Sequence, residues 1–148
     1  MTSGAGPWRS GDVGGFEPFP DAALDASIGD RFLEIAGRYP DRQAISSPAG
    51  VWTYAELEAD VRRWAAAIAR SVGTSGESVA LVAEHDGPLV VGILSVLVSG
   101  NVVVVVDPIA PADQQRHVLD ECRAALVIHD DALAVTATGL AEAAGVHA

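Results

Sequence analysis

Acidic side chains stand directly after three short apolar segments of the sequence, and their type makes them the first candidates for chemistry. The positions are 84–86 (Glu-His-Asp), Asp107 and 129–131 (His-Asp-Asp). If the apolar segments are parallel strands, their carboxyl ends meet at one edge of a sheet, where ligands collect. A carboxylate cluster there would suit Mg²⁺. Carboxylates at such positions also cap the helices that follow strands, as Asp86 would ahead of Pro88, and we favour this second interpretation.

Lysine is absent from the sequence, which removes several kinds of chemistry. All nine basic residues are arginine, so Schiff-base catalysis, a phosphate-loop lysine and a lysine general base are excluded. A receiver-type phosphoacceptor site would share the acidic sheet edge but also uses a lysine, so it is disfavoured. Segment 73–77 (Gly-Thr-Ser-Gly-Glu) has the letters of a phosphate cradle. A phosphate-binding loop follows a strand and opens a helix, whereas this segment follows a predicted helix and opens a strand. We therefore interpret it as a connecting turn.

The histidines and the cysteine do not form a ligand set. His117 and Cys122 are five residues apart and therefore lie on different sides of a helix. The other histidines, which have no ligand spacing either, are His85, His129 and His147. A single cysteine excludes an internal disulfide and fits a reducing compartment, so we expect a cytoplasmic protein. No Ser-His-Asp arrangement or glycosidase carboxylate pair is present in the pattern.

Composition and charge place the chain among single-domain globular proteins. Its 148 residues are 49% hydrophobic, and the formal net charge is −11. Nucleic-acid and anionic-lipid partners are disfavoured, because phosphate binding needs clustered cations. Residues 1–26 are rich in Gly and Pro and lack any period, so they are predicted to be a disordered leader. The folded domain is predicted over 27–148.

Two helices and a hairpin are predicted before the first buried strand. The first helix covers 28–39 and ends at Pro40, and strands 43–46 and 51–53 form the hairpin. Thr53 and Glu56 have the spacing of a capping box at the start of the second helix. Gly73 is expected to end that helix in the left-handed conformation. The apolar stripe of the second helix is predicted to comprise Leu57, Val61, Trp64 and Ile68.

The uncharged stretch 89–106 could be a membrane span or a helix followed by a strand. Gly100-Asn101 interrupts its middle, and both flanks are acidic, whereas a span needs roughly 20 continuous apolar residues and basic flanks. We therefore predict no membrane span, but a helix over 88–99 and a strand over 102–106. Five consecutive valines in that strand favour burial on both faces.

Three strands joined by helical crossovers make a right-handed, parallel β-α-β-α-β unit, so the predicted fold class is a three-layer α/β fold. A further Ala-rich helix is predicted over 131–144. The strands are predicted at 78–84, 102–106 and 124–129, with crossover helices at 88–99 and 111–122.

Four segments, at 32–45, 52–57, 75–97 and 97–111, share their order and spacing with one known family. They resemble the AMP-forming adenylating enzymes, the superfamily of acyl-CoA synthetases, nonribosomal-peptide adenylation domains and luciferases. Residues 52–57 (WTYAEL) resemble the "(L/W)TYxEL" motif near the start of that family. Residues 97–111 (LVSGNVVVVVDPIAP) resemble "LKAGxxxVPLDPxxP". Residues 32–45 and 75–97 match the context of these motifs in order and spacing. Val98-Ser99 replaces the family's Lys-Ala, and Val105 replaces its proline, which are packing positions.

The resemblance covers only the opening segment of the family's large domain. Its ATP-phosphate loop, its adenine and ribose contacts and its C-terminal lysine domain correspond to nothing in this sequence. The resemblance implies ATP and Mg²⁺ for the family, yet we assign no catalytic, cofactor-binding or metal-ligating residue here and expect no cofactor to be bound by this chain alone. We expect a catalytically incomplete part of an acyl or aminoacyl adenylating ligase, truncated or split, whose partners are the remainder of the enzyme or a carrier protein. The alternative is a non-catalytic module that binds a synthetase or a carrier protein.

Overall fold

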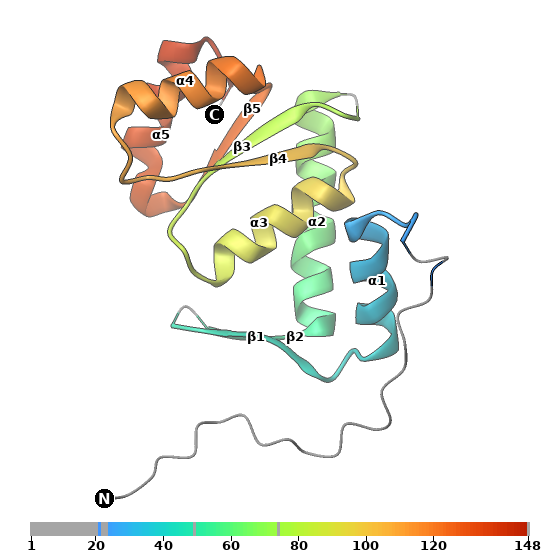
Figure 1. Cartoon of the computed structure of the whole chain (residues 1–148). Helices are drawn as coiled ribbons and strands as arrows, with labels where there is room; N and C mark the ends of the chain where they lie inside the picture. The colour runs from blue at the N-terminus through green and yellow to red at the C-terminus, as the bar shows by residue number, and fades with distance from the viewer. Residues whose placement is uncertain (1–20, 22–23, 49, 74, 148) are drawn as a thin grey trace, which may run out of the picture.

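The computed structural model describes residues 21, 24–48, 50–73 and 75–147 (Figure 1). Most of the predicted leader, residues 1–20 and 22–23, lies outside the described residues, and the domain boundary at 26/27 stays a prediction. The elements follow the predicted order. They are α1 (Ile28–Arg38), β1 (Gln43–Ser47), β2 (Gly50–Thr53), α2 (Tyr54–Val72), β3 (Ser78–Val82), α3 (Gly87–Val98), β4 (Val102–Val106), α4 (Ala112–Cys122), β5 (Leu126–His129), the 3-10 turn η2 (Asp131–Leu133) and α5 (Ala134–Ala144).

The three parallel strands form a sheet in the order β4-β3-β5, and β1 and β2 form a separate antiparallel hairpin. The first crossover runs from β3 to β4 through α3, and the second returns through α4 to the far side of β3. Right-handed crossovers in opposite directions place their helices on opposite faces of the sheet. Val79 and Leu81 accordingly pack with Ile68 of α2 and Val96 of α3, while the alternate residues of β3 pack with α4 and α5. The predicted three-layer α/β class is confirmed.

The expectation that the valine strand is buried on both faces is wrong. β4 lies at an edge of the sheet, because the second crossover makes β3 the central strand. Val102 and Val105 are 52% and 44% exposed, whereas Val106 is 2% exposed. The central strand is the one whose residues from Val79 to Val82 are all at most 2% exposed.

The second helix begins and ends as its local signals predict. Thr53 Oγ1 accepts a hydrogen bond from the Glu56 N–H at 3.3 Å, and the Glu56 carboxylate accepts from the Thr53 N–H at 2.8 Å. These bonds to Thr53, its backbone first, lower the pKa of the Glu56 carboxyl. Gly73 closes the helix at φ 76°. The stripe prediction is wrong at one residue: Trp64 is 48% exposed, and Ala65 at 6% takes the buried position.

The uncharged stretch divides as predicted into α3, a Gly-Asn turn and β4. Asn101 has a larger role than stopping the helix, because its Oδ1 accepts from the Glu77 N–H at 3.0 Å and its Nδ2 donates to Ser99 Oγ at 2.9 Å. It thereby fixes the start of β3 beside the start of β4. Among the described residues, no helix is long and apolar enough to span a bilayer.

Helix α1 packs closely across the end of α3 (Figure 1). A Cβ placed on Gly29 would lie 3.0 Å from the Leu97 carbonyl oxygen and 3.1 Å from the Val98 Cα. The absence of a side chain at Gly29 therefore permits the two backbones to approach. Gly37, near the other end of the same helix, has nothing within 4 Å of such a Cβ.

Candidate functional site

Two acidic residues at the strand ends, Asp86 and Asp130, bind backbone amides and cap the elements that follow. Asp86 Oδ1 accepts from the Gly87 N–H at 2.6 Å and caps α3, with Pro88 in its first turn. Asp130 uses both oxygens, accepting from Glu84 N–H at 3.0 Å and from Leu133 N–H at 2.9 Å. It therefore caps η2 and also ties the end of β5 to the end of β3. In the part of the chain that the structure describes, no three His, Cys, Asp or Glu side chains are placed to hold a metal ion.

The capping interpretation fails at Asp107. Its Oδ1 accepts from the Ile109 N–H at 3.0 Å within the loop, and the following helix is preceded by Pro111, which offers no side-chain cap. Gln115, only 3% exposed, donates from Nε2 to the Asp107 carbonyl oxygen at 2.9 Å. Asp107 thus shapes the β4–α4 loop, and Gln115 holds that loop against the helix.

Segment 73–77 is a connecting turn, as predicted. It joins α2 to β3, and the Gly76 N–H donates to the Gly100 carbonyl oxygen at 2.9 Å. The Gly76 amide therefore joins this turn to the turn at Gly100.

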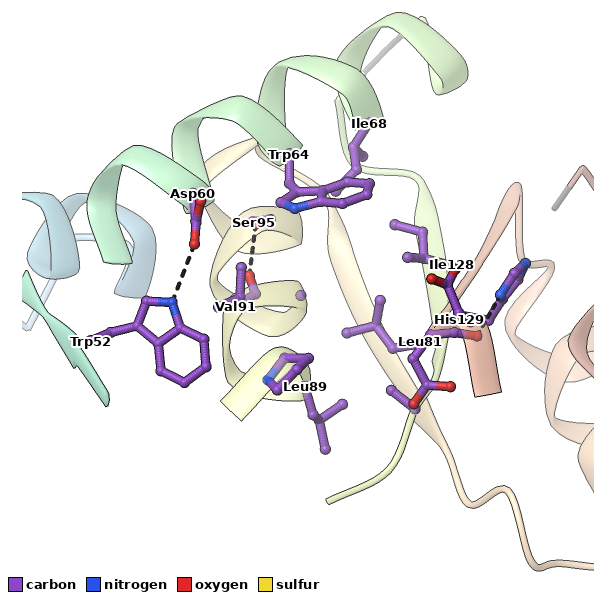
Figure 2. Close-up of a pocket in the computed structure, with 15 residues that line it drawn as sticks. Trp52, Asp60, Trp64, Ile68, Leu81, Leu89, Val91, Ser95, Ile128 and His129 are labelled. Carbon is purple, nitrogen blue, oxygen red and sulfur yellow. Dashed lines mark hydrogen bonds between the residues drawn. The ribbon is translucent and has the colours of Figure 1, made fainter. Parts of the chain in front are cut away.

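A groove opens on the face of the sheet that α2 and α3 cover (Figure 2). Its volume is about 360 Å³. Figure 2 shows Trp64 extending from α2 over the hollow, with Leu81 and Ile128 of the sheet beneath and α3 opposite. We call this surface the Trp64 groove; its main apolar lining is Trp64, Ile68, Leu81, Leu89, Val91 and Ile128.

One end of the groove is built around Trp52. The Trp52 indole Nε1–H donates to Asp60 Oδ2 at 3.2 Å, which joins β2 to α2 (Figure 2). A Cβ on Gly87 would approach the Trp52 ring to 2.6 Å, so the helix start at Gly87 is shaped to admit the indole. Asp60, Asp130 and Asp131 are among the lining residues. Asp60 forms an ion pair with Arg63 at 2.9 Å, so the acidic character of the rim comes from Asp130 and Asp131.

The outer edge of β5 borders the same region. The Val127 N–H donates to the His147 carbonyl oxygen at 2.8 Å, and Leu126 and His147 form a parallel bridge. Because strand N–H groups alternate in direction, the His129 N–H points to the same edge as that of Val127. The side of β5 away from β3 therefore carries one isolated parallel bridge, between Leu126 and His147.

Sequence reasoning missed this groove. Its lining residues come from β2, α2, β3, α3, β5 and η2 and from the loops that follow β3 and β5, and no sequence motif joins these segments. The sequence assigns Trp64 to the buried stripe of the second helix, because its position fits the helical period.

The described residues thus form a parallel, three-layer α/β unit with an apolar groove on one face of its sheet. The model of the AMP-binding enzyme family matches residues 32–147. The chain therefore belongs to the AMP-binding enzyme family, the AMP-forming adenylating enzymes that the sequence resembles.

Its relatives are large synthetases. Malformin synthetase mlfA of Aspergillus tubingensis is 31% identical over 120 residues, which are 81% of this chain and 2% of the synthetase. The N-terminal subdomain of NpsA from Klebsiella oxytoca, solved with 3-hydroxyanthranilyl-AMSN, is 31% identical at a TM-score of 0.67, with 75% of this chain and 28% of that one covered. The nonribosomal peptide synthetase FmoA3 shares the fold at 24% identity and a TM-score of 0.72, with 82% of this chain and 13% of that one covered. The chain thus spans only a small part of these proteins.

Proposed function

We propose that this chain is the opening segment of an acyl or aminoacyl adenylation domain of the nonribosomal-peptide-synthetase kind, and that it is inactive until the remainder of the domain joins it. The observation that carries the proposal is the family match over 32–147 in a sequence without lysine. The carboxylates of Asp86, Asp107 and Asp130 accept hydrogen bonds from backbone amides, which supports a scaffolding role for the strand ends. ATP, Mg²⁺ and the carboxylic acid would be held by residues of the remainder.

The chain's own contribution is positional. Asn101 fixes the starts of β3 and β4, and Asp130 fixes the ends of β3 and β5, so both ends of the sheet are tied by side chains. Such a sheet can hold the loops of a completed domain in place. After activation, the acceptor would be a carrier-protein thiol, by analogy with NpsA-ThdA, an artificially fused adenylation–PCP di-domain. We propose a cytoplasmic setting for this chemistry, in keeping with the single cysteine.

Pyrophosphate exchange with ATP tests the proposal. The purified chain, offered a panel of carboxylic and amino acids, should give no exchange above background. The chain co-expressed with NpsA lacking its own matching segment should restore exchange with 3-hydroxyanthranilate, the acid of the analogue bound in that structure. Exchange by the isolated chain would contradict the incompleteness. No exchange from the co-expressed pair would contradict the role as an adenylation segment.

The second candidate is a non-catalytic module that binds a synthetase or a carrier protein. The exposed Trp64 and the acid-rimmed groove favour it, because tryptophan is enriched at binding hot spots. An intact synthetase that binds the chain without any change in exchange rate would support the module over the segment.

A further inference from the structure

We propose that the Trp64 groove and the outer edge of β5 form one docking surface for the remainder of an adenylation domain. The occupant supplies a parallel strand beside β5 and an apolar segment with flanking Arg or Lys residues that fills the groove. This inference rests on the proposed function and adds to it the place and the chemistry of the contact.

The edge of β5 already shows the geometry of the incoming strand. The hydrogen bond from Val127 N–H to the His147 carbonyl oxygen is the first step of a parallel ladder, and the His129 N–H is the next donor in that direction. The occupant's strand pairs with β5 beyond His147, where the His129 N–H faces the same edge. Main-chain pairing of this kind supplies affinity, and side-chain pockets supply selectivity.

The two faces of β5 differ in how they are covered. Val127 is 1% exposed and packs with Ala137 and Leu140 of α5. Ile128, which points to the opposite face, is only half-buried and lines the groove. Strands of parallel sheets normally have both faces covered, so the α2/α3 face at Ile128 calls for an apolar partner.

The charge and the size of the partner follow from the surface and its relatives. Asp130 and Asp131 line the groove after β5, while Asp60 is paired with Arg63. These two aspartates and the net charge of −11 favour a basic flank on the occupant. The matched region is 28% of the NpsA N-terminal subdomain. Most of such a subdomain therefore lies outside this chain and can cover the surface.

Co-purification measures the contact directly. The full chain, carrying an affinity tag, is co-expressed with NpsA that lacks its own matching segment, and the NpsA segment itself is the positive control. We expect Trp64→Glu to reduce the recovered partner by roughly 30-fold, as for an interfacial hot spot of about 2 kcal/mol. Val135→Glu places the same charge at a 90% exposed valine of α5 and should leave recovery unchanged.

Hydrogen exchange locates the contact on the chain and distinguishes the partner from the leader as the occupant of the surface. Peptides covering 124–131 should gain protection in the complex, and Asp131→Asn should reduce recovery more at low salt than at high salt. Failure to recover the partner, or equal recovery with Trp64→Glu and Val135→Glu, would overturn the docking surface. So would increased exchange at 124–131 after removal of residues 1–20, because the leader would then be the occupant. Recovery without pyrophosphate exchange would contradict the proposed function and leave the docking surface standing.

Discussion

Two glycines of helix α1 allow a matched test of how tightly the first helix is packed. Gly29 is buried and Gly37 is exposed, and both lie in the same helix. Alanine is favoured over glycine in helices by about 0.5–1 kcal/mol, so propensity alone predicts that both Gly29→Ala and Gly37→Ala stabilise the fold. The contacts around the two glycines instead predict that the two substitutions change the free energy of unfolding in opposite directions.

The magnitudes follow from the space at each position. At Gly37 a Cβ meets nothing within 4 Å, so Gly37→Ala should gain about 0.5–1 kcal/mol. At Gly29 the Cβ would meet the Leu97 carbonyl group and the Val98 Cα at 3.0–3.1 Å. These are backbone atoms that cannot rotate away, and overpacking of this kind costs about 1–3 kcal/mol. The net result for Gly29→Ala should be a loss of about 1–2 kcal/mol.

Urea unfolding followed by far-UV circular dichroism measures both changes. Tryptophan fluorescence serves as a second probe, since coincident transitions support a two-state treatment. The midpoint should fall for Gly29→Ala and rise for Gly37→Ala at unchanged slope. Equal stabilisation by both substitutions would refute the close approach of α1 to α3.

Two further predictions concern the start of α2. Thr53→Ala removes an N-cap and should lower the free energy of unfolding in the urea assay by about 1 kcal/mol. The control, Thr138→Ala on the exposed side of α5, should cost nothing. Equal effects of the two substitutions would contradict the cap. Because the pKa of Glu56 is lowered in the folded state from its ordinary value of 4.5, its contribution is complete above about pH 4.5 and is lost as the pH falls through the lowered value. Unfolding midpoints between pH 3 and 6 should therefore fall less steeply for Glu56→Gln than for the unaltered chain, and parallel curves would contradict the linkage.

The sequence predicts those parts of the fold that depend on contacts between residues close together in the chain. The capping box of Thr53 and Glu56 and the stop at Gly73 each depend on atoms within one helical turn, and both are confirmed. The order of strands in the sheet cannot be predicted in this way. A run of five valines suits a central strand or an edge strand equally, and the later crossover decides which position it takes. Trp64 fits the helical period, yet its side chain lies over a groove whose other walls come from distant segments. Such a site exists only after the sheet has formed.

The position of β3 has a consequence during synthesis. It is the central strand, yet it emerges from the ribosome before both of the strands that flank it, and β5 follows it by more than forty residues. At about 5–20 residues per second, an apolar strand is left with an open edge for several seconds. The chain is thus most vulnerable to wrong pairing while it is being translated, and chaperone demand should depend on the rate at which codons between β3 and β5 are read.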